Sequence, residues 1–150
     1  MANKMASEVV AILGTVDPDV TVASTVVSDY VDAADFESIM GIVMVGTLGT
    51  SATVDAKLRQ ATDSSGTGVK DITGAAITQL TEAGTDSDKQ AIIELRPDDL
   101  DLDGGFQFVS LSITVAVATS DVAGIVLGVH PRTGPASDND LASVDEIVTT

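Results

Sequence analysis

A strict alternation of apolar and polar side chains over residues 52–59 is the sequence feature that most limits how this chain can fold. One set of positions is apolar (Ala52, Val54, Ala56 and Leu58) and the other is polar or charged (Thr53, Asp55, Lys57 and Arg59). This period of two predicts a strand with one face toward a core and one toward water. The turn-forming segment 63–68 and the extended pattern of Val69–Ile72 follow, so we expect a β-hairpin.

The longest alternation runs from Phe106 to Thr119, and a second runs from Val122 to His130. The first has aliphatic residues on one side (Val109, Leu111, Ile113, Val115 and Val117) and small residues on the other. In the second, aliphatic positions (Ala123, Ile125, Leu127 and Val129) oppose a set that contains Gly124, Val126 and Gly128. Ser120-Asp121 is typical of a tight connection, so we expect a second hairpin. Small residues on its outer face would permit close approach of another chain, or form a thin solvent-facing surface.

Further strands are expected on both sides of these hairpins. They cover Glu8–Leu13, Val20–Ser28 after a turn at Asp17-Pro18-Asp19, and Lys89–Leu95. Phe36–Leu48 is almost continuously apolar, which predicts a central strand that is buried on both sides or covered by a partner subunit. Residues 74–83 fit a helix or a strand equally well.

Short strands separated by Gly, Asp, Pro and Ser turns indicate an all-β fold, an antiparallel β-sandwich or jelly roll with extended terminal arms. The 150 residues suffice for a single domain, 1–150. Within it we expect an extended C-terminal arm, 131–150, that ends in a short apolar strand around residues 141–148. Such an arm either packs on its own domain or adds to a sheet edge of a neighbouring subunit.

Composition excludes several function classes. The chain has no cysteine, which rules out disulfides, zinc thiolate sites and thiol catalysis. Its 23 acidic and 7 basic residues give a net charge of -16, so we expect no nucleic-acid binding. This charge either attracts a basic partner surface or maintains solubility in a saline habitat. No apolar run approaches the roughly 18 residues of a membrane span, so we expect neither a membrane protein nor a signal-bearing precursor.

One acidic segment resembles site chemistry. Asp99, Asp101 and Asp103 alternate with leucines before Gly104, a spacing similar to the start of a calcium loop. The position where such a loop carries a bidentate Glu is Ser110, inside an expected strand. The segment is therefore either an acidic turn whose carboxylates cap backbone amides or a cation site. We expect no metal and no cofactor.

Few residues of this sequence are arranged as catalytic groups are. His130 is the only histidine and stands at the end of an expected strand, so no Ser-His-Asp arrangement is supported. Asp98 and Asp99 are adjacent on a turn, where side chains usually diverge, and sugar-cleaving clefts normally contain aromatics. We therefore expect a protein that is not an enzyme.

A family resemblance lies in the hairpin segment. Lys57-x-Arg59-x-x-x-Asp63, then a Ser/Gly/Thr turn, then VKDITGAA at 69–76 resembles small β-sandwich structural proteins of tailed bacteriophages that decorate or cement the head. The resemblance implies a virion protein at the capsid surface, with the major capsid protein as its partner. It also implies a homo-oligomer, with a trimer as the expected form, that stabilises the lattice by bridging capsid subunits.

Terminal segments are the expected means of contact. Lys4 and Met5 near the amino end, and Arg132 in the tail, are the candidate capsid-contacting residues, because a basic or apolar group near a free arm can dock into a neighbour. Two alternatives stay open: a ring-forming neck or tail component, and a carbohydrate- or receptor-binding module. The module is disfavoured because the chain has only four aromatic residues: Tyr30, Phe36, Phe106 and Phe108.

Overall fold

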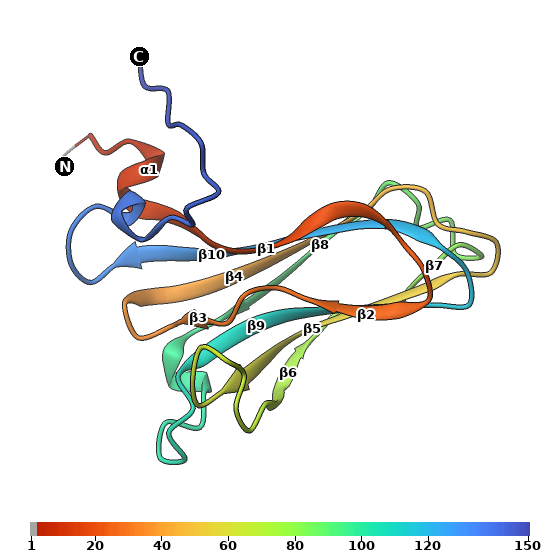
Figure 1. The fold of residues 1–150 in the computed structure, drawn as a ribbon, viewed down its shortest axis with the longest axis horizontal. Coiled ribbons are helices and arrows are strands. Elements are labelled where there is room, and N and C mark those ends of the chain that lie inside the picture. The colour runs from red at the N-terminus through yellow and green to blue at the C-terminus, as the bar shows by residue number, and fades with distance from the viewer. Residues whose placement is uncertain (1–2) are drawn as a thin grey trace.

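The alternating segments form two antiparallel sheets that pack face to face, in a computed structural model that describes residues 3–150 (Figure 1). The strands are β1 (Val10–Thr21), β2 (Ser24–Val27), β3 (Val31–Asp32), β4 (Phe36–Val45), β5 (Thr53–Ala61), β6 (Lys70–Ala76), β7 (Leu80–Thr81), β8 (Gln90–Leu95), β9 (Phe108–Ala116) and β10 (Ser120–Pro131). The helical turns are α1 (Ala6–Val9), η1 (Pro97–Asp99) and η2 (Ala136–Asn139). Within the described residues, no helix has the length and hydropathy needed to cross a membrane.

Strand order identifies the fold as a jelly roll. Sheet A has the order β1-β10-β4-β8, and sheet B has the order β2-β9-β5-β6, with β3 beside β9 and β7 beside β5. The chain crosses from one sheet to the other at most connections, as jelly-roll topology requires of two packed sheets. Aliphatic side chains from both inner faces fill the space between the sheets. The expected all-β fold is thus confirmed.

The first hairpin forms as predicted, and β4 is a central strand as predicted, but it is buried on one side only, because its Met40, Ile42 and Met44 are half-buried on the outer face. β5 and β6 pair antiparallel, with Arg59 opposite Asp71. Their turn contains Gly66 at φ +81, and a Cβ there would lie 2.6 Å from the Tyr30 ring, so glycine is required both for conformation and for space. β4 lies between β10 and β8, and its Ile39 and Val43 are fully buried.

The predicted second hairpin is wrong, because β9 and β10 lie in different sheets. β9 pairs with β2, β3 and β5, whereas β10 pairs with β1 and β4. The short connection is a corner in which Val117 takes φ +73 and is 69% exposed instead of facing the core. Crossing at this corner lets the inward faces of both strands meet across the core, which side-by-side pairing would not allow.

The orientation of β10 also differs from the expected one. Its glycines face inward: a Cβ on Gly124 would lie 2.6 Å from Leu111 Cδ2, and one on Gly128 would lie 2.7 Å from Leu13 Cδ1 and from the Phe36 ring. Large side chains of the opposite sheet and of neighbouring strands occupy the space above both glycines. The aliphatic set therefore points outward and is only half-buried: Ala123, Ile125, Leu127 and Val129.

The amino-terminal prediction is partly wrong. Residues 6–9 form α1, and β1 begins only at Val10. The expected turn at residues 17–19 is a bulge within β1, where the register against β10 shifts between Val16 and Asp19. A bulge absorbs the proline and the extra residues without ending the strand. The ambiguous segment 74–83 contains the end of β6 and all of β7, and so is extended.

The first part of the tail packs on its own domain. Ala136 is fully buried, the Ile12 N–H donates to Asp140 Oδ1 at 2.7 Å, and the Leu141 N–H donates to the Ile12 carbonyl at 2.8 Å. Among the described residues, no strand forms beyond Pro131, so the predicted terminal strand is wrong. Asp140 and Leu141 take the backbone groups that a paired strand would use at the β1 edge. The end of the tail lies at the same end of the sandwich as α1 (Figure 1).

Candidate docking surface

The outer face of sheet A carries a continuous set of aliphatic side chains, here called the apolar face. All four strands contribute: Val10 and Ile12 from β1, Met40, Ile42 and Met44 from β4, Ile92 from β8, and Ala123, Ile125, Leu127 and Val129 from β10. Ile92 is 60% exposed, and the others are half-buried. These side chains bury one another in part by packing side by side, and the outer surface of the apolar face is left to solvent.

Strand register makes the apolar face continuous. Ile42 has Ile125 opposite it on β10 and Ile92 opposite it on β8. Leu127 lies in the same way between Ile12 and Met40. Directly opposed side chains on one sheet face contact each other, so these rows form one surface and not isolated apolar residues. Contiguous exposed apolar patches typically mark interaction sites.

A hollow of about 520 Å³ extends the apolar face toward one end of the sandwich. Met44 and Ala123 line it from β4 and β10, and Val20, which is 63% exposed, lines it from β1. The β1 bulge places Asp19 and Pro18 at its rim. The apolar face therefore offers both a flat area and a depression to a partner.

The outer face of sheet B has the opposite chemistry. Thr25 and Thr114 share a hydrogen bond between their hydroxyls at 2.8 Å. Asp71 accepts from Lys57 Nζ at 2.7 Å and from Arg59 Nε at 2.9 Å. The hydrogen bond from Lys57, together with the Arg59 guanidinium, lowers the pKa of the Asp71 carboxyl. A face made of charged and hydroxyl groups that bind one another is suited to contact with water.

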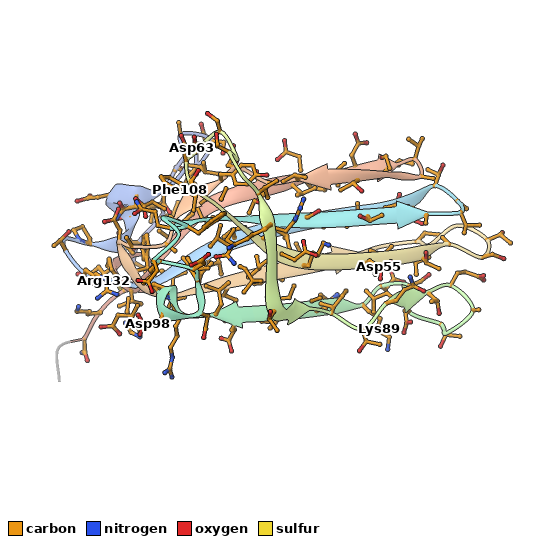
Figure 2. The ribbon with its side chains drawn as sticks, turned by 90° about the horizontal axis from the view of Figure 1, so that it is seen from below. Asp55, Asp63, Lys89, Asp98, Phe108 and Arg132 are labelled. Atoms are coloured by element: carbon orange, nitrogen blue, oxygen red, sulfur yellow. The ribbon has the colours of Figure 1, made fainter. Side chains whose placement is uncertain are left out.

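The candidate contact residues lie near one end of the sandwich but do not form one site. Lys4 is exposed, and Met5, which is 45% exposed, precedes α1. The Arg132 side chain is committed to its own domain: its Nε donates to the Ala34 carbonyl at 2.8 Å. Figure 2 shows Arg132 and Asp98 at the same end of the molecule, far along the sandwich from Lys89. Across residues 3–150, no hydrogen bond or ion pair joins Arg132 to Lys4 or Met5.

The acidic segment behaves as a turn. Asp99 Oδ2 accepts from the Arg96 N–H at 2.8 Å, and Asp101 Oδ1 accepts from the Gly104 N–H at 3.0 Å. Lys70 Nζ donates to the other Asp101 oxygen, and this bond, with the Gly104 amide, lowers the pKa of the Asp101 carboxyl. Asp99, Asp101 and Asp103 do not converge on one point where they could share an ion. Residues 3–150 contain no group of three or more acidic, histidine or cysteine side chains placed to hold a metal ion.

A polar cleft of about 540 Å³ opens on the side of the sandwich, between β6 and β8. Its charged lining residues are Lys70, Asp71, Glu94, Asp99 and Asp101. Lys70 lies 4.0 Å above the Phe106 ring, whereas the cleft lining itself contains no aromatic residue. A cleft that binds a sugar normally offers an aromatic face for stacking, so this one is a weaker candidate site than the apolar face.

Sequence reasoning did not identify the apolar face. The alternation in 122–130 was visible, but alternation alone does not say which set faces the core. Gly124 and Gly128 were the available signal, because glycine inside a strand often marks a close approach of other groups.

Comparison with protein families and with curated protein sequences gives no match. Among solved structures, a chain in a structure of infectious bursal disease virus Gt strain has a TM-score of 0.46 at 12% identity, with 85% of this chain and 33% of that chain covered. A chain from Cowpea mosaic virus top component has a TM-score of 0.45 at 11% identity, covering 85% and 86%. A chain of the Bacillus endospore appendages, described as disulfide-linked pili, has a TM-score of 0.40 at 12% identity, covering 89% and 99%. These similarities place the chain in no family.

Proposed function

We propose that this protein is a non-enzymatic structural component of a tailed-phage particle, a capsid decoration or cement protein that binds the head lattice and bridges capsid subunits. The observation that carries the proposal is the apolar face, which leaves aliphatic side chains of four strands open to solvent on a chain of net charge -16. The major capsid protein is the proposed partner, and the capsid surface is the proposed location.

The size of the apolar face suits the centre of an interface. Four strands at a spacing of about 4.8 Å, with outward residues over about 20 Å of strand length, give a projected area of roughly 300 Å². A specific protein interface buries about 800 Å² per partner and combines an apolar centre with a polar rim. Glu94 and Gln90 on β8, and Thr15 and Asp17 on β1, flank the apolar rows and supply such a rim.

The ends of the chain extend the proposed contact. Lys4 and Met5 lie just before α1, at the end where the first part of the tail packs on β1. Residues 142–150 continue beyond that packed part without a helix or strand. We propose that Lys4, Met5 and the last residues reach neighbouring subunits. Arg132, whose side chain binds the Ala34 carbonyl, contributes through the surface of the domain itself.

Placement in the neck or tail is the alternative within the same class. A ring-forming connector would use the same apolar face at a low, fixed copy number. A carbohydrate- or receptor-binding module would instead use the polar cleft between β6 and β8, whose lining offers hydrogen-bonding groups but no aromatic face. Binding of glycans to an array, lost on Lys70→Ala, would favour the module.

A matched pair of substitutions tests the proposal. Ala123 lies on the apolar face, and Ala116 lies on the outer face of sheet B; both alanines are half-buried. Particles that lack the protein are incubated with each purified variant, and the bound copies are counted by cryo-electron microscopy. Ala123→Lys should reduce occupancy at least about tenfold, as the loss of a central contact does, whereas Ala116→Lys should bind like the unmodified chain.

Deletion of residues 142–150 gives a second measurement on the same particles. It removes no residue of η2 and spares the hydrogen bonds of Asp140 and Leu141 to β1. We expect weaker binding with an unchanged fold. Equal occupancy for Ala123→Lys and Ala116→Lys would contradict docking through the apolar face, and absence of the unmodified chain from particles would contradict the function.

A further inference from the structure

Three of the four sheet edges are protected, and β8 is the exception. At the β1 edge, the strand is bulged twice against β10, and Asp140 and Leu141 bind its backbone. The β2 edge is only four residues long, and the β6 edge has an irregular register against β5. β8 keeps an unbroken register with β4 over six residues. Natural proteins usually blunt a regular, exposed edge of this kind, because it is a template for another strand.

The unpaired backbone groups of β8 belong to Gln90, Ile92 and Glu94. The Val45 N–H donates to the Lys89 carbonyl at 3.0 Å, which sets the alternation of bonded and non-bonded pairs along β4 and β8. The backbone groups of Ala91, Ile93 and Leu95 therefore face β4, and those of the three residues between face away. No backbone or side-chain hydrogen bond reaches these three from another segment in residues 3–150.

We propose that a second copy of this chain pairs with this edge, β8 against β8, antiparallel about a two-fold axis at Ile92. In this register, Ile92 faces Ile92 of the second copy, and Gln90 faces its Glu94. All three residues with free backbone groups then find partners, because they are spaced symmetrically around Ile92. A register centred on Gln90 or on Glu94 leaves some of these groups unpaired, and centring on Glu94 places two like charges opposite each other.

Side chains agree with the same register. Ile92 is 60% exposed in the single chain and would be covered by its own copy. Asp88 precedes β8 and Arg96 follows it, so the two-fold brings Arg96 of each copy to the end of the paired strands that carries Asp88 of the other, and opposite charges meet at both ends. Both residues are exposed, and neither takes part in an ion pair within the described chain. This charge complementarity selects a second copy over an unrelated strand.

The pairing joins two A sheets into one continuous eight-stranded sheet and places two apolar faces side by side. It builds a two-fold dimer and not the trimer that the family resemblance implies. The inference depends only on the β8 edge, so it holds whether or not the protein belongs to a phage particle. Its tests use the purified full chain without particles.

Cysteine cross-linking tests the register directly, because the chain has no cysteine of its own. A hydrogen-bonded antiparallel pair separates Cα atoms by about 5.5 Å, within the range of about 4.4–6.8 Å that a disulfide spans. Ile92→Cys should form a disulfide-linked dimer under mild oxidation much faster than Val20→Cys, whose parent side chain on β1 is exposed to a similar degree, 63%. Equal cross-linking rates would overturn the proposal.

Sedimentation of cysteine-free variants gives the second test. Ile92→Pro removes the central free N–H, which faces away from β4, so the fold should persist in circular dichroism while the dimer is lost. Ile92→Thr keeps the N–H and is the matched control. We expect the unmodified chain and Ile92→Thr to dimerise more strongly as salt screens the net charge of -16 on each copy. A monomeric unmodified chain at every concentration and salt level, or a dimer unaffected by Ile92→Pro, would overturn the proposal.

Discussion

The two outer faces of the sandwich differ in chemistry although both belong to antiparallel sheets. Sheet B presents hydroxyls and ion pairs, such as Thr25 with Thr114 and Asp71 with Lys57. Sheet A presents Met40, Ile42 and their aliphatic neighbours. An antiparallel sheet commonly has one face on the core and one polar face toward water. Sheet B follows this rule and sheet A does not, and the proposed contact with a partner rests on this difference.

The difference arises mainly in β10. Gly124 and Gly128 face the core, where no room exists for a side chain, so the aliphatic residues of this strand stand outside. A strand of this composition could have filled the core with its aliphatic set and left glycines outside. The inward glycines let Leu111 and Phe36 pack closely, while the outer aliphatic set stays available for a partner.

The largest expected effect therefore comes from filling the inward face of β10. Gly128→Val should destabilise the fold by about 3 kcal/mol, because its Cβ alone would meet Leu13 and Phe36 at 2.7 Å. Urea unfolding at pH 7 gives the measurement. Ala123→Val, on the outward face of the same strand, is the control and should change stability by less than about 0.5 kcal/mol. A larger loss for Ala123→Val than for Gly128→Val would reverse the assignment of the two faces.

Hydroxyls on the outer side of sheet B provide a smaller test. Ser110 is fully buried, and its Oγ has no hydrogen-bond partner among the described residues, whereas the Thr114 hydroxyl bonds to Thr25. Ser110→Ala removes an unsatisfied group and should raise the free energy of unfolding by about 1 kcal/mol. Thr114→Val removes a bonded hydroxyl and should lower it by about 0.5–1 kcal/mol. A loss of stability for Ser110→Ala together with a gain for Thr114→Val in urea unfolding would contradict these hydrogen-bond assignments.

The smallest effect is expected at the exposed ion pairs of the hairpin. Asp71→Asn should change stability at pH 7 by less than about 1 kcal/mol, because surface ion pairs contribute little. Its hydrogen bonds with Lys57 and Arg59 lower the pKa of Asp71 in the folded state. The stabilisation is thus complete above the unfolded carboxyl pKa of about 3.9 and is lost as pH falls through the folded value.

Acid unfolding measures that contribution. The unmodified chain should lose stability between pH 5 and pH 2 somewhat more steeply than Asp71→Asn, because the variant has no carboxyl to protonate at this position. Asp55→Asn removes a carboxylate of the same face that forms no ion pair within the described chain, and serves as the control. Identical acid curves for the unmodified chain and Asp71→Asn would show that the ion pairs add nothing to the fold.

The elements that sequence predicted well are those whose signal is local. The β5–β6 hairpin follows from the alternation at 52–59 and the glycine turn, and β4 follows from a long apolar run. Local signals specify a strand but not its sheet. The connection at 117–119 is as short as a hairpin turn yet crosses the core, and only the packing of both sheets decides between these outcomes.

Alternation also shows that every second side chain lies on the same face of a strand. It does not show which of the two sets faces the core, because a shift of one residue exchanges the faces. The outward direction of Ile125 and Leu127 depends on Leu111 and Phe36, which are distant in sequence and lie close to β10 in space. The candidate contacts Lys4, Met5 and Arg132 follow only from their place in the chain. Their joint role stays a prediction, and the apolar face became visible only with the register of sheet A.

A cryo-EM reconstruction of virus particles isolated from the source of this chain would test whether the outer face of sheet A docks on the head lattice. We expect density for the jelly roll repeated over the head lattice, with the outer face of sheet A against a neighbouring subunit and the charged face of sheet B toward solvent. Density in which sheet B makes the contact while Met40, Ile42 and Ile125 face solvent would contradict it.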